Sequence, residues 1–472
     1  MKTKLFFSTI IFFLFAFAAV HAQTHVWALT LNGGAFNQGA IIISNNDGTG
    51  LNVAHSFQSP DGYHPYGNLL SASDGNLYGT CYDGGTYGSC TIFRLAPATG
   101  IYTDVVSFDI VHGDYPRSGV VEGPNGILYG AASAGGSAGG GVIYSYDMNT
   151  GVYNGLFNLN SVSGTVPYGN PILRSDGKLY GMTTSGGLYS NGVIYCYDIA
   201  NNIYTDVFDF DGTNGSNPKG SLVEGSDGTL YGMTSAGGVN SAGVLFSFNP
   251  SEGGFSKLFD FATATGSLPQ GTLMQATNGL LYGVTSVGGV NSDGVIFSFN
   301  PSNGVYITLH NFNGADGSLP LCKLMQSGNI LCGAASSGGT SNEGVMFNYD
   351  ITSGIYTKVM DFDGNNGANP NGGYIEVLST TGLVNSGMLD QNIAVFPNPL
   401  SSENLHVSIN SNHSEKVALS LRDVTGRLVY SVEENLDLNN SATLKMNEFN
   451  AGTYFLEIKS GNETVIRKIV KE

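Results

Sequence analysis

The stretch GTLYGMTSAGGVNSAGVLFSFNP, from Gly228 to Pro250, holds two apolar runs separated by a glycine-rich loop. Almost the same string recurs along the chain. Its glycine pair has equivalents spaced by 51 residues five times and then by 50, and the pairs begin at Gly33, Gly84, Gly135, Gly186, Gly237, Gly288 and Gly338. The same period is kept by an aromatic residue at Trp27, Tyr78, Tyr129, Tyr180, Tyr231 and Tyr282, and by a proline at Pro65, Pro116, Pro167, Pro218, Pro269, Pro320 and Pro370. Three independent markers with one period indicate a tandem repeat.

Each repeat predicts four short strands, which we call a to d. In the repeat around Tyr231 they are Ser221–Glu224, Thr229–Thr234, Gly243–Asn249 and Phe255–Phe261. Alternating apolar residues between Gly, Asn, Asp and Pro turns are typical of strands and hairpins. A four-stranded unit cannot bury both of its faces alone, whereas units arranged around an axis cover one another. The predicted fold class is all-β, with a seven-bladed β-propeller followed by a small C-terminal β-sandwich.

The two ends of the repeat region predict how the ring closes. The chain enters at a strand b, His25–Leu31, without a strand a before it. The missing strand a appears after Pro370, as Gly373–Leu378, and no strand b follows it. We expect this last segment to pair beside Trp27, which removes two open sheet edges.

The repeat resembles two known families. It is similar to kelch-type blades in its GKLY strand (Gly177–Tyr180), its glycine pair and its GVIYCYD strand (Gly192–Asp198), but it lacks a tryptophan in strand d. It resembles more closely the bacterial GloVer tandem repeats, whose LYG-T--GG core matches Leu77–Gly85, Leu128–Gly136, Leu179–Gly187, Leu230–Gly238 and Leu281–Gly289. That family has no settled activity, so this resemblance implies a fold and no function.

The N-terminus predicts export. Lys2 and Lys4 precede an apolar run from Leu5 to Val20, and Ala22 completes a small-residue site for signal peptidase. The run is shorter than the ~20 residues of a spanning helix, so residues 1–22 are predicted to be a signal peptide. Further boundaries are expected at 23–380 for the propeller, 381–391 for a linker and 392–472 for the tail. No later stretch of the sequence predicts a transmembrane segment.

The tail loses the 51-residue period and contains six strand-like runs, typical of a small β-sandwich. It resembles the C-terminal sorting domain of the type IX (Por) secretion system, which implies that residues 392–472 engage that machinery. The matching pieces follow in the family's order: Phe396-Pro397-Asn398-Pro399, the DVTGR run with Gly426, the AGTY run with Gly452, and the KIVK terminus with Lys468 and Lys471. The resemblance implies translocation across the outer membrane and then release or attachment at the cell surface.

Charge excludes one class of partner. The chain has 18 basic and 36 acidic residues, a formal net charge of -18. Such a protein repels phosphate backbones, so nucleic acid is not an expected partner.

Strand direction sorts the loops onto two faces. The tight a–b and c–d turns share one face, and the longer b–c and d–a loops share the other, where binding residues usually lie. The early loops of this long-loop face carry the candidate ligand-binding residues, which are Tyr63, His64, Tyr66, His112, Tyr115, Arg117 and Tyr168 in d–a loops and Tyr87 and Tyr189 in b–c loops. Tyrosines with a polar rim suit a sugar ring or a protein partner. The alternative is that these rings only cover neighbouring blades.

Sequence motifs for catalysis or cofactors are not evident. Histidines and cysteines are scattered without metal-ligand spacing, and no nucleophile motif stands out, so no cofactor, metal or catalytic residue is predicted. Cys81-Cys90 and Cys322-Cys332 could each bridge a hairpin, or all five cysteines could be buried free thiols. The expected function is therefore an exported, non-catalytic binding protein for a glycan or a protein. A secreted carbohydrate-active enzyme using His64, Tyr66, His112, Tyr115 or Arg117, and a purely structural surface protein, are the alternatives.

Overall fold

The computed structural model describes residues 24–45, 47–59, 61–378, 393–396, 404–409, 416–423, 428–435, 441–447, 449, 452–460 and 463–471. They belong to two compact units, one of them Thr24–Val377 and the other containing the tail. The predicted signal peptide (1–22), linker (381–391) and sorting residues Pro397, Asn398, Pro399 and Gly426 lie outside the described residues. None of the helices in the described ranges has the length and hydrophobicity needed to cross a bilayer.

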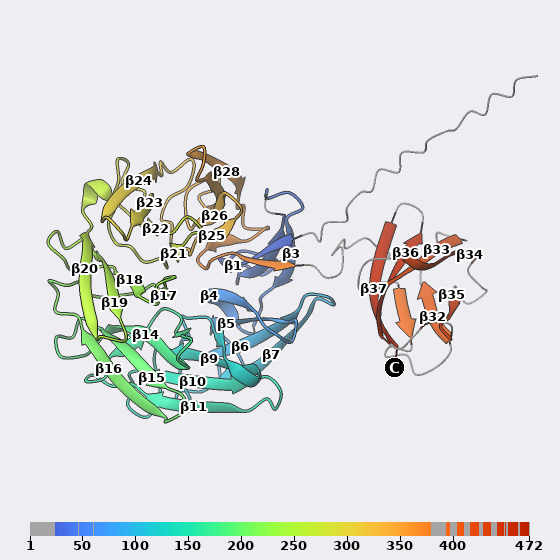
Figure 1. Cartoon of the computed structure of the whole chain (residues 1–472), viewed down its shortest axis with the longest axis horizontal. Helices are drawn as coiled ribbons and strands as arrows, with labels where there is room; N and C mark the ends of the chain where they lie inside the picture. Colours follow the sequence, from blue (N-terminus) through green and yellow to red (C-terminus); the bar gives the residue numbers. More distant parts are fainter. Residues whose placement is uncertain are drawn as a thin grey trace, which may run out of the picture. The chain divides into compact units, whose positions relative to one another are not determined.

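The first unit is a ring of seven antiparallel sheets (Figure 1). The first sheet contains β1 (Thr24–Asn32), β2 (Ala40–Ser44) and β3 (Asn52–Ser56), together with β29 (Ala368–Pro370) and β30 (Ile375–Leu378) from the other end of the unit. The second contains β4 (Tyr63–Ser71), β5 (Leu77–Asp83), β6 (Cys90–Ala96) and β7 (Ile101–Phe108). The third contains β8 (Val121–Glu122), β9 (Ile127–Ala132), β10 (Val142–Asp147) and β11 (Tyr153–Asn158).

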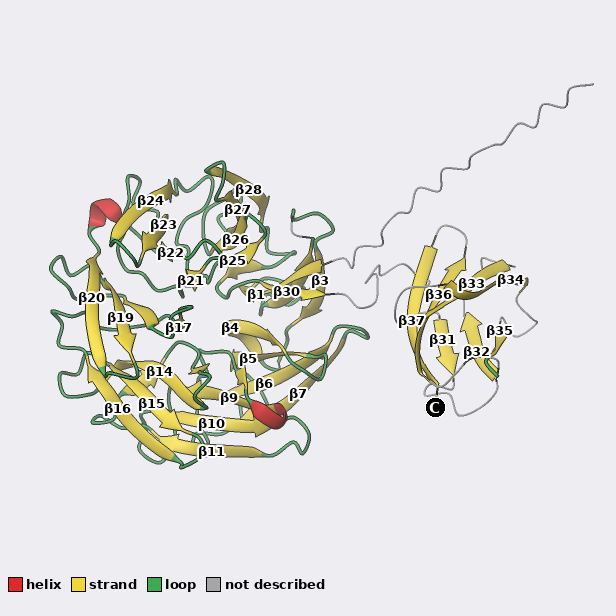
Figure 2. Cartoon of the chain, in the orientation of Figure 1, coloured by secondary structure: helices red, strands yellow, loops and turns green. Residues whose placement is uncertain are grey.

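The other four sheets repeat this plan. The fourth contains β12 (Thr165–Pro167), β13 (Ile172–Leu173), β14 (Lys178–Ser185), β15 (Val193–Asp198) and β16 (Ile203–Asp209). The fifth contains β17 (Val223–Glu224), β18 (Leu230–Thr234), β19 (Val244–Asn249) and β20 (Gly254–Asp260), and the sixth contains β21 (Met274–Gln275), β22 (Leu281–Thr285), β23 (Val295–Asn300) and β24 (Val305–Asn311). The seventh contains β25 (Met325–Ser327), β26 (Ile330–Ala335), β27 (Val345–Asp350) and β28 (Ile355–Asp361). The described helices are two short 3-10 turns, Pro124–Gly126 and Thr263–Thr265 (Figure 2).

Ring closure is confirmed by the pairing of the two ends. Strands β29 and β30 both pair with β1, and β29 places Pro370 opposite Thr30 and Ala368 opposite Asn32. The first sheet is therefore built from both ends of the repeat region, and β1 has no free edge on that side.

Packing between neighbouring sheets forms the core. One cluster joins Tyr231 and Met233 of the fifth sheet to Leu281 and Phe297 of the sixth, and all four are buried. The glycine that recurs in each LYG string has a steric reason, because a Cβ on Gly283 would lie 2.7 Å from Phe297 Cζ. A glycine in strand b thus makes room for the aromatic ring of strand c.

The repeat prolines and the residues before them form contacts between neighbouring sheets. The residue before each one has a left-handed backbone with φ between 50° and 60°, and these residues are His64, Tyr115, Val166, Asn217, Leu268, Leu319 and Asn369. That conformation aims the backbone N–H at the preceding b–c loop, as in Asn217 N to Asn191 O at 2.9 Å. The proline then packs on a glycine of the preceding sheet, since a Cβ on Gly243 would lie 2.8 Å from Pro269 Cδ.

Strand a differs from its predicted length. In the fifth sheet it is only Val223–Glu224, whereas Ser221–Glu224 was predicted. Ser221 N donates instead to Thr272 Oγ1 of the next sheet, at 2.9 Å. At the start of strand a, the backbone therefore forms a hydrogen bond to the neighbouring sheet instead of to strand b of its own sheet.

Of the two alternatives for the cysteines, the structure shows the free thiols, because all five cysteines are unbridged and buried. Cys81 is paired across the hairpin with Thr91, so the adjacent Cys90 points to the opposite face of the sheet. The second pair is offset along its hairpin, because Cys332 is opposite Met325 and the Cys322 sulfur accepts a hydrogen bond from Ala334 N at 3.3 Å.

The tail forms two antiparallel sheets. One contains β31 (Ile393–Phe396), β32 (Asn404–Ile409) and β35 (Ser441–Lys445), and the other contains β33 (Lys416–Asp423), β34 (Leu428–Asn435), β36 (Gly452–Ser460) and β37 (Glu463–Lys471). Strand β31, which ends at Phe396, was not predicted. A core of buried aliphatic residues such as Leu419 and Leu456 fills this unit. Gly452 opens β36, Lys468 lies within β37, and Lys471 Nζ donates to Met446 O at 2.6 Å and to Phe449 O.

Candidate functional site

The residue after each repeat proline faces the axis of the ring. We call these seven positions the mouth ring, and they are Tyr66, Arg117, Tyr168, Lys219, Gln270, Leu321 and Asn371. The next residue is often glycine because the sheets approach most closely here. A Cβ on Gly220 would lie 2.3 Å from Gly271 O, and one on Gly372 would lie 2.0 Å from Gly67 O.

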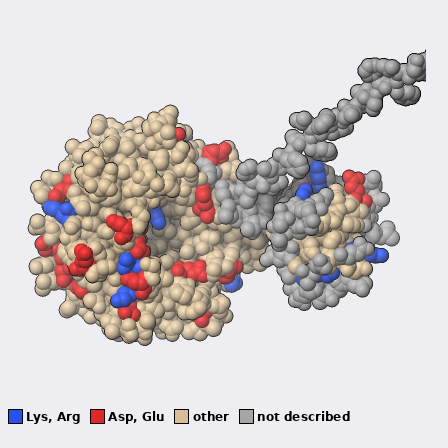
Figure 3. Space-filling model, viewed as in Figure 1, with Lys and Arg blue, Asp and Glu red and all other residues tan. Residues whose placement is uncertain are grey.

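The mouth ring opens into an axial cavity with two parts. A polar pocket of ≈ 60 Å³ is lined by the whole mouth ring. An apolar pocket of ≈ 470 Å³ is lined by residues such as Leu222, Leu324 and Ile375. The two pockets share Asn68, Asn170, Ser221, Thr272 and Lys323, and every sheet contributes to both. Acidic side chains outnumber basic ones on the face of the propeller seen in Figure 3, and that face is hollowed near its middle.

Side chains at the junction of the two pockets hold the sheets together. Asn170 Oδ1 accepts from Gly119 N at 2.8 Å, and Asn68 Oδ1 accepts from Gly373 N at 2.5 Å. Lys323 occupies the same position in the seventh sheet, and no hydrogen bond or ion pair links its ammonium to the described residues. Burial lowers the pKa of Lys323, although its side chain is open to solvent within the cavity.

A cluster of four tyrosines surrounds Arg117 at one side of the mouth ring. We call Tyr66, Tyr82, Tyr115, Tyr168 and Arg117 the Tyr–Arg cluster. The Arg117 guanidinium lies 4.9 Å from the Tyr82 ring centre and 5.1 Å from that of Tyr168, and its Nη2 donates to Tyr82 OH at 3.0 Å. Tyr82 stacks on Tyr115 at 4.7 Å, and the hydroxyls of Tyr66 and Tyr168 share a short hydrogen bond.

Burial within the Tyr–Arg cluster favours the neutral form of the Tyr66 phenol. Burial raises the pKa of Tyr66, and the nearby Tyr168 hydroxyl raises it further. Neutral tyrosines combine an apolar ring with a hydroxyl that can donate or accept. All five side chains remain partly accessible to solvent.

A side pocket of ≈ 310 Å³ adjoins the cluster. It is lined by Leu31, Asn32, His64, Tyr66, Tyr82, Asp83 and Arg117. His64 Nδ1 lies 2.9 Å from Asp83 Oδ2, so an imidazole oriented by a carboxylate faces the same space as the tyrosines. The structure thus brings together His64, Tyr66, Tyr115, Arg117 and Tyr168 of the candidate residues.

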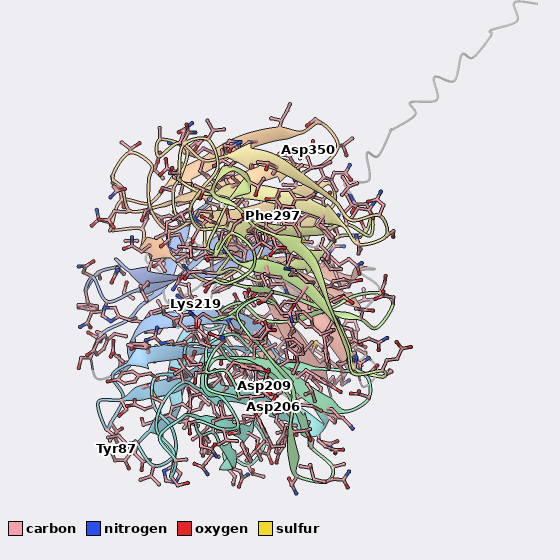
Figure 4. The ribbon with its side chains drawn as sticks, turned by 90° about the vertical axis from the view of Figure 1, so that its left-hand side faces the viewer. Tyr87, Asp206, Asp209, Lys219, Phe297 and Asp350 are labelled. Atoms are coloured by element: carbon pink, nitrogen blue, oxygen red, sulfur yellow. The ribbon has the colours of Figure 1, made fainter. Side chains whose placement is uncertain are left out.

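Four other candidate residues do not line the side pocket or the polar pocket. Tyr63 packs edge-on to His64 and against the core between the first two sheets. His112 is exposed in its loop and contacts Asp109 at 2.6 Å. Tyr87 and Tyr189 are 66% and 53% exposed, and in Figure 4 Tyr87 lies at the edge of the ring, far from Lys219.

Three cavity residues were missed from the sequence, namely Tyr82, Lys219 and Lys323. The equivalents of Tyr82 in five other repeats are Ser133, Thr184, Ser235, Ser286 and Ser336, so an aromatic residue at this position was a visible departure from the repeat. Lys219 follows a repeat proline just as Arg117 does. Comparing each repeat position around the ring, rather than reading each loop separately, would have found them.

The chain belongs to the Gloeobacter/Verrucomicrobia repeat family, whose model matches residues 17–174 and 167–396. Residues 394–472 match the secretion system C-terminal sorting domain. The protein is therefore a substrate of the type IX system and is secreted or attached to the cell surface.

Solved structures agree with the fold. A candidate 6-phosphogluconolactonase of Bacteroides uniformis is 15% identical with a TM-score of 0.52, and covers 76% of this chain and 100% of its own. A candidate 6-phosphogluconolactonase of Bacteroides fragilis is also 15% identical with a TM-score of 0.53, and covers 76% of this chain and 99% of its own. At this level of identity the similarity concerns the fold alone. Among curated proteins, no sequence matches the chain significantly.

Proposed function

We propose that the protein is an exported, non-catalytic carbohydrate-binding protein whose site is the Tyr–Arg cluster at the mouth of the axial cavity. We further propose that residues 1–22 are removed as a signal peptide and that residues 381–391 link the propeller, residues 23–380, to the sorting domain. A protein ligand is the second candidate, since tyrosine and arginine are also enriched at protein interfaces.

The observation that supports a sugar ligand is the convergence of Tyr66, Tyr82, Tyr115 and Tyr168 around one arginine. Aromatic faces pack against the apolar C–H faces of sugar rings, while the phenol and guanidinium groups donate hydrogen bonds to hydroxyls. The side pocket beside Tyr66 and Tyr82 provides concave space for such a ring. The cluster is held on strand ends and on the segments that enter the sheets, so little ordering is needed on binding.

A glycan array with the full chain tests this proposal, with the bound oligosaccharides then titrated by calorimetry. The double variant Tyr66→Ala/Tyr168→Ala should weaken binding by about tenfold or more, because it removes two ring faces from the site. The matched control is Tyr189→Ala, which removes an exposed tyrosine outside the cluster and should leave affinity unchanged.

Mass spectrometry of each bound oligosaccharide after incubation separates binding from catalysis. An unchanged oligosaccharide is the expected result. Cleavage that is lost in His64→Gln would instead support the enzyme alternative, with the His64–Asp83 pair as its acid–base group. Binding that is equally weakened by the cluster variant and by Tyr189→Ala would contradict the proposed site.

A further inference from the structure

Basic residues are few in the propeller, and most of them face a carboxylate. Residues 24–378 contain eight, which are Arg94, Arg117, Arg174, Lys178, Lys219, Lys257, Lys323 and Lys358. Four form ion pairs, namely Arg174 with Asp176 and Glu224, Lys178 with Asp198, Lys257 with Asp260, and Lys358 with Asp361. A fifth, Arg94, lies near Asp74, whose pKa is lowered despite partial burial by hydrogen bonds from Asn76 and Tyr78 and by the Arg94 charge.

The three remaining cations all line the polar pocket of the axial cavity. They are Arg117, Lys219 and Lys323. Arg117 and Lys219 flank Tyr168 on the mouth ring, at 5.1 and 5.7 Å from the centre of its ring. Their hydrogen-bond partners are neutral, because Arg117 donates to Tyr82 OH and Lys219 Nζ donates to Gln270 Oε1 at 3.2 Å. Their positive charges are therefore not compensated by the partners they contact.

Lys323 adds a third cation below the mouth ring, at the junction with the apolar pocket. Burial disfavours its charged form, and its three N–H donors have no partner in the described part of the chain. The Lys323 side chain is exposed to the cavity, where water can solvate its ammonium group. A bound anion can replace that water and supply both the opposite charge and the hydrogen-bond acceptors.

Carboxylates are absent from the walls of both axial pockets among the residues that the structure describes. The side pocket contains one carboxylate, Asp83, and it is engaged with His64. In a chain with a net charge of -18, this cavity is thus a local positive region. A narrow cavity with low-dielectric walls concentrates such a field.

We propose that the axial cavity recognises the anionic group of an acidic sugar, so that the ligand of the proposed binding site is a glycan bearing carboxylate or sulfate groups. The sugar ring packs against Tyr66 and Tyr168, and its anionic group lies between Arg117, Lys219 and Lys323. The polar pocket of ≈ 60 Å³ has room for a few water molecules or for one such group. This inference rests on the proposed function and names the class of its ligand.

Calorimetry with the full chain tests the inference with matched oligosaccharides. The probes are tetragalacturonate for the carboxylate, a sulfated galacto-oligosaccharide for the sulfate, and neutral galactotetraose. We expect at least one acidic probe to bind about tenfold or more tightly than the neutral one, and its affinity to fall with added sodium chloride. The tighter of the two acidic probes identifies the anionic group.

Charge variants locate the site. Lys323→Gln and Lys219→Gln should each weaken the acidic probe by about tenfold, a clearly larger loss than for the neutral probe. The matched control is Lys358→Gln, which removes a cation already paired with Asp361. As a second readout, the acidic probe should raise the melting temperature of the native protein and not that of Lys323→Gln.

The possible results separate this inference from the proposed function. Equal binding of neutral and acidic probes, with no effect of Lys323→Gln or Lys219→Gln, would retain the sugar site and overturn the inference. Binding of inorganic sulfate that depends on Lys323, without binding of any oligosaccharide, would retain an anion site and overturn the glycan function. Failure to bind any of these probes would overturn both.

Discussion

The early and late halves of the ring have the same backbone and different chemistry. Sheets two to four carry Tyr66, Arg117 and Tyr168 on the mouth ring, followed by Lys219 at the entry to sheet five, whereas the positions after these are Gln270, Leu321 and Asn371. The residue before the proline has a left-handed backbone in both halves. The period therefore specifies the scaffold, and departures from the period provide the side chains of the proposed binding site.

Breaking the ring should affect both halves together, and this is the largest effect that we expect. Deleting residues 368–378 removes β29 and β30 from β1 and takes Ile375 and Val377 away from the core between the first two sheets. We expect loss of the cooperative thermal transition of the propeller, measured by circular dichroism. Deleting residues 394–472 is the control and should retain it, because the tail belongs to the other compact unit. A normal transition without residues 368–378 would contradict closure as the source of stability.

Core positions should respond equally in the two halves. Phe93 and Phe297 occupy the same repeat position and are fully buried. Phe93→Ala and Phe297→Ala should each lower the free energy of unfolding by about 3–5 kcal/mol, because each leaves a cavity between sheets. Chemical denaturation measures both. A difference of more than about 2 kcal/mol between them would show that the halves are not equivalent scaffolds.

Tyr82→Ser makes the early half resemble the other repeats at the proposed binding site. Ser235 and Ser286, at the same repeat position, donate through Oγ to the carbonyl of the left-handed residue, at 2.6 and 2.7 Å. The variant can form that hydrogen bond, so its melting temperature should change little. It loses the Tyr115 stack and the Arg117 hydrogen bond, so its affinity for tetragalacturonate should fall by roughly tenfold. Unchanged affinity would place the ligand elsewhere.

Outer strands differ in charge between the halves. Asp206 on β16 lies beside Asp209 (Figure 4), whereas its later equivalents Lys257 and Lys358 pair with Asp260 and Asp361. Burial raises the pKa of Asp206 to about 6, and the Asp209 charge adds to that shift. A carboxyl whose pKa is higher in the folded protein than in the unfolded chain destabilises the fold when it ionises. The free energy of unfolding should therefore decrease as pH rises from about 4 to about 6.

Asp206→Lys should remove this loss of stability at higher pH. Because Asp206 is only about half buried, we expect a gain of about 1 kcal/mol at pH 7 rather than the full value implied by the shift. The gain should shrink toward pH 4, where Asp206 is protonated in the folded protein and is partly protonated in the unfolded chain. Unfolding free energies at the two pH values measure this, with Asp206→Asn as the uncharged control. Identical pH dependence of the native protein and both variants would contradict the assignment.

The smallest effect that we expect is at a buried tyrosine. Tyr195 is fully buried and its hydroxyl has no hydrogen-bond partner in the described residues, whereas Phe246, Phe297 and Phe347 occupy the same repeat position in the late half. Tyr195→Phe should raise the free energy of unfolding by up to about 1 kcal/mol, because it removes an unsatisfied polar group. A destabilised variant would show that the hydroxyl is satisfied in solution, for example by water.

The sequence alone determined the period, the strand pattern, the closure by Gly373–Leu378 and the sorting tail. These features follow from local chemistry that is written along the chain, since glycine, proline and alternating apolar residues act on their own neighbourhood. Arg117, Tyr168 and Lys219 were each visible as residues after a proline. Their convergence was not visible, because it depends on seven segments about 51 residues apart meeting at one axis.

Tertiary structure alone decided which candidates share a site. It placed Tyr82 against Arg117 and put Lys323 inside the cavity, while Tyr87 and Tyr189 are exposed and line neither the cavity nor the side pocket. It also separated Cys81 from Cys90 onto opposite faces of one sheet. The physical reason is that the side of a strand and the distance from the axis depend on register and on packing between sheets, which no single repeat contains.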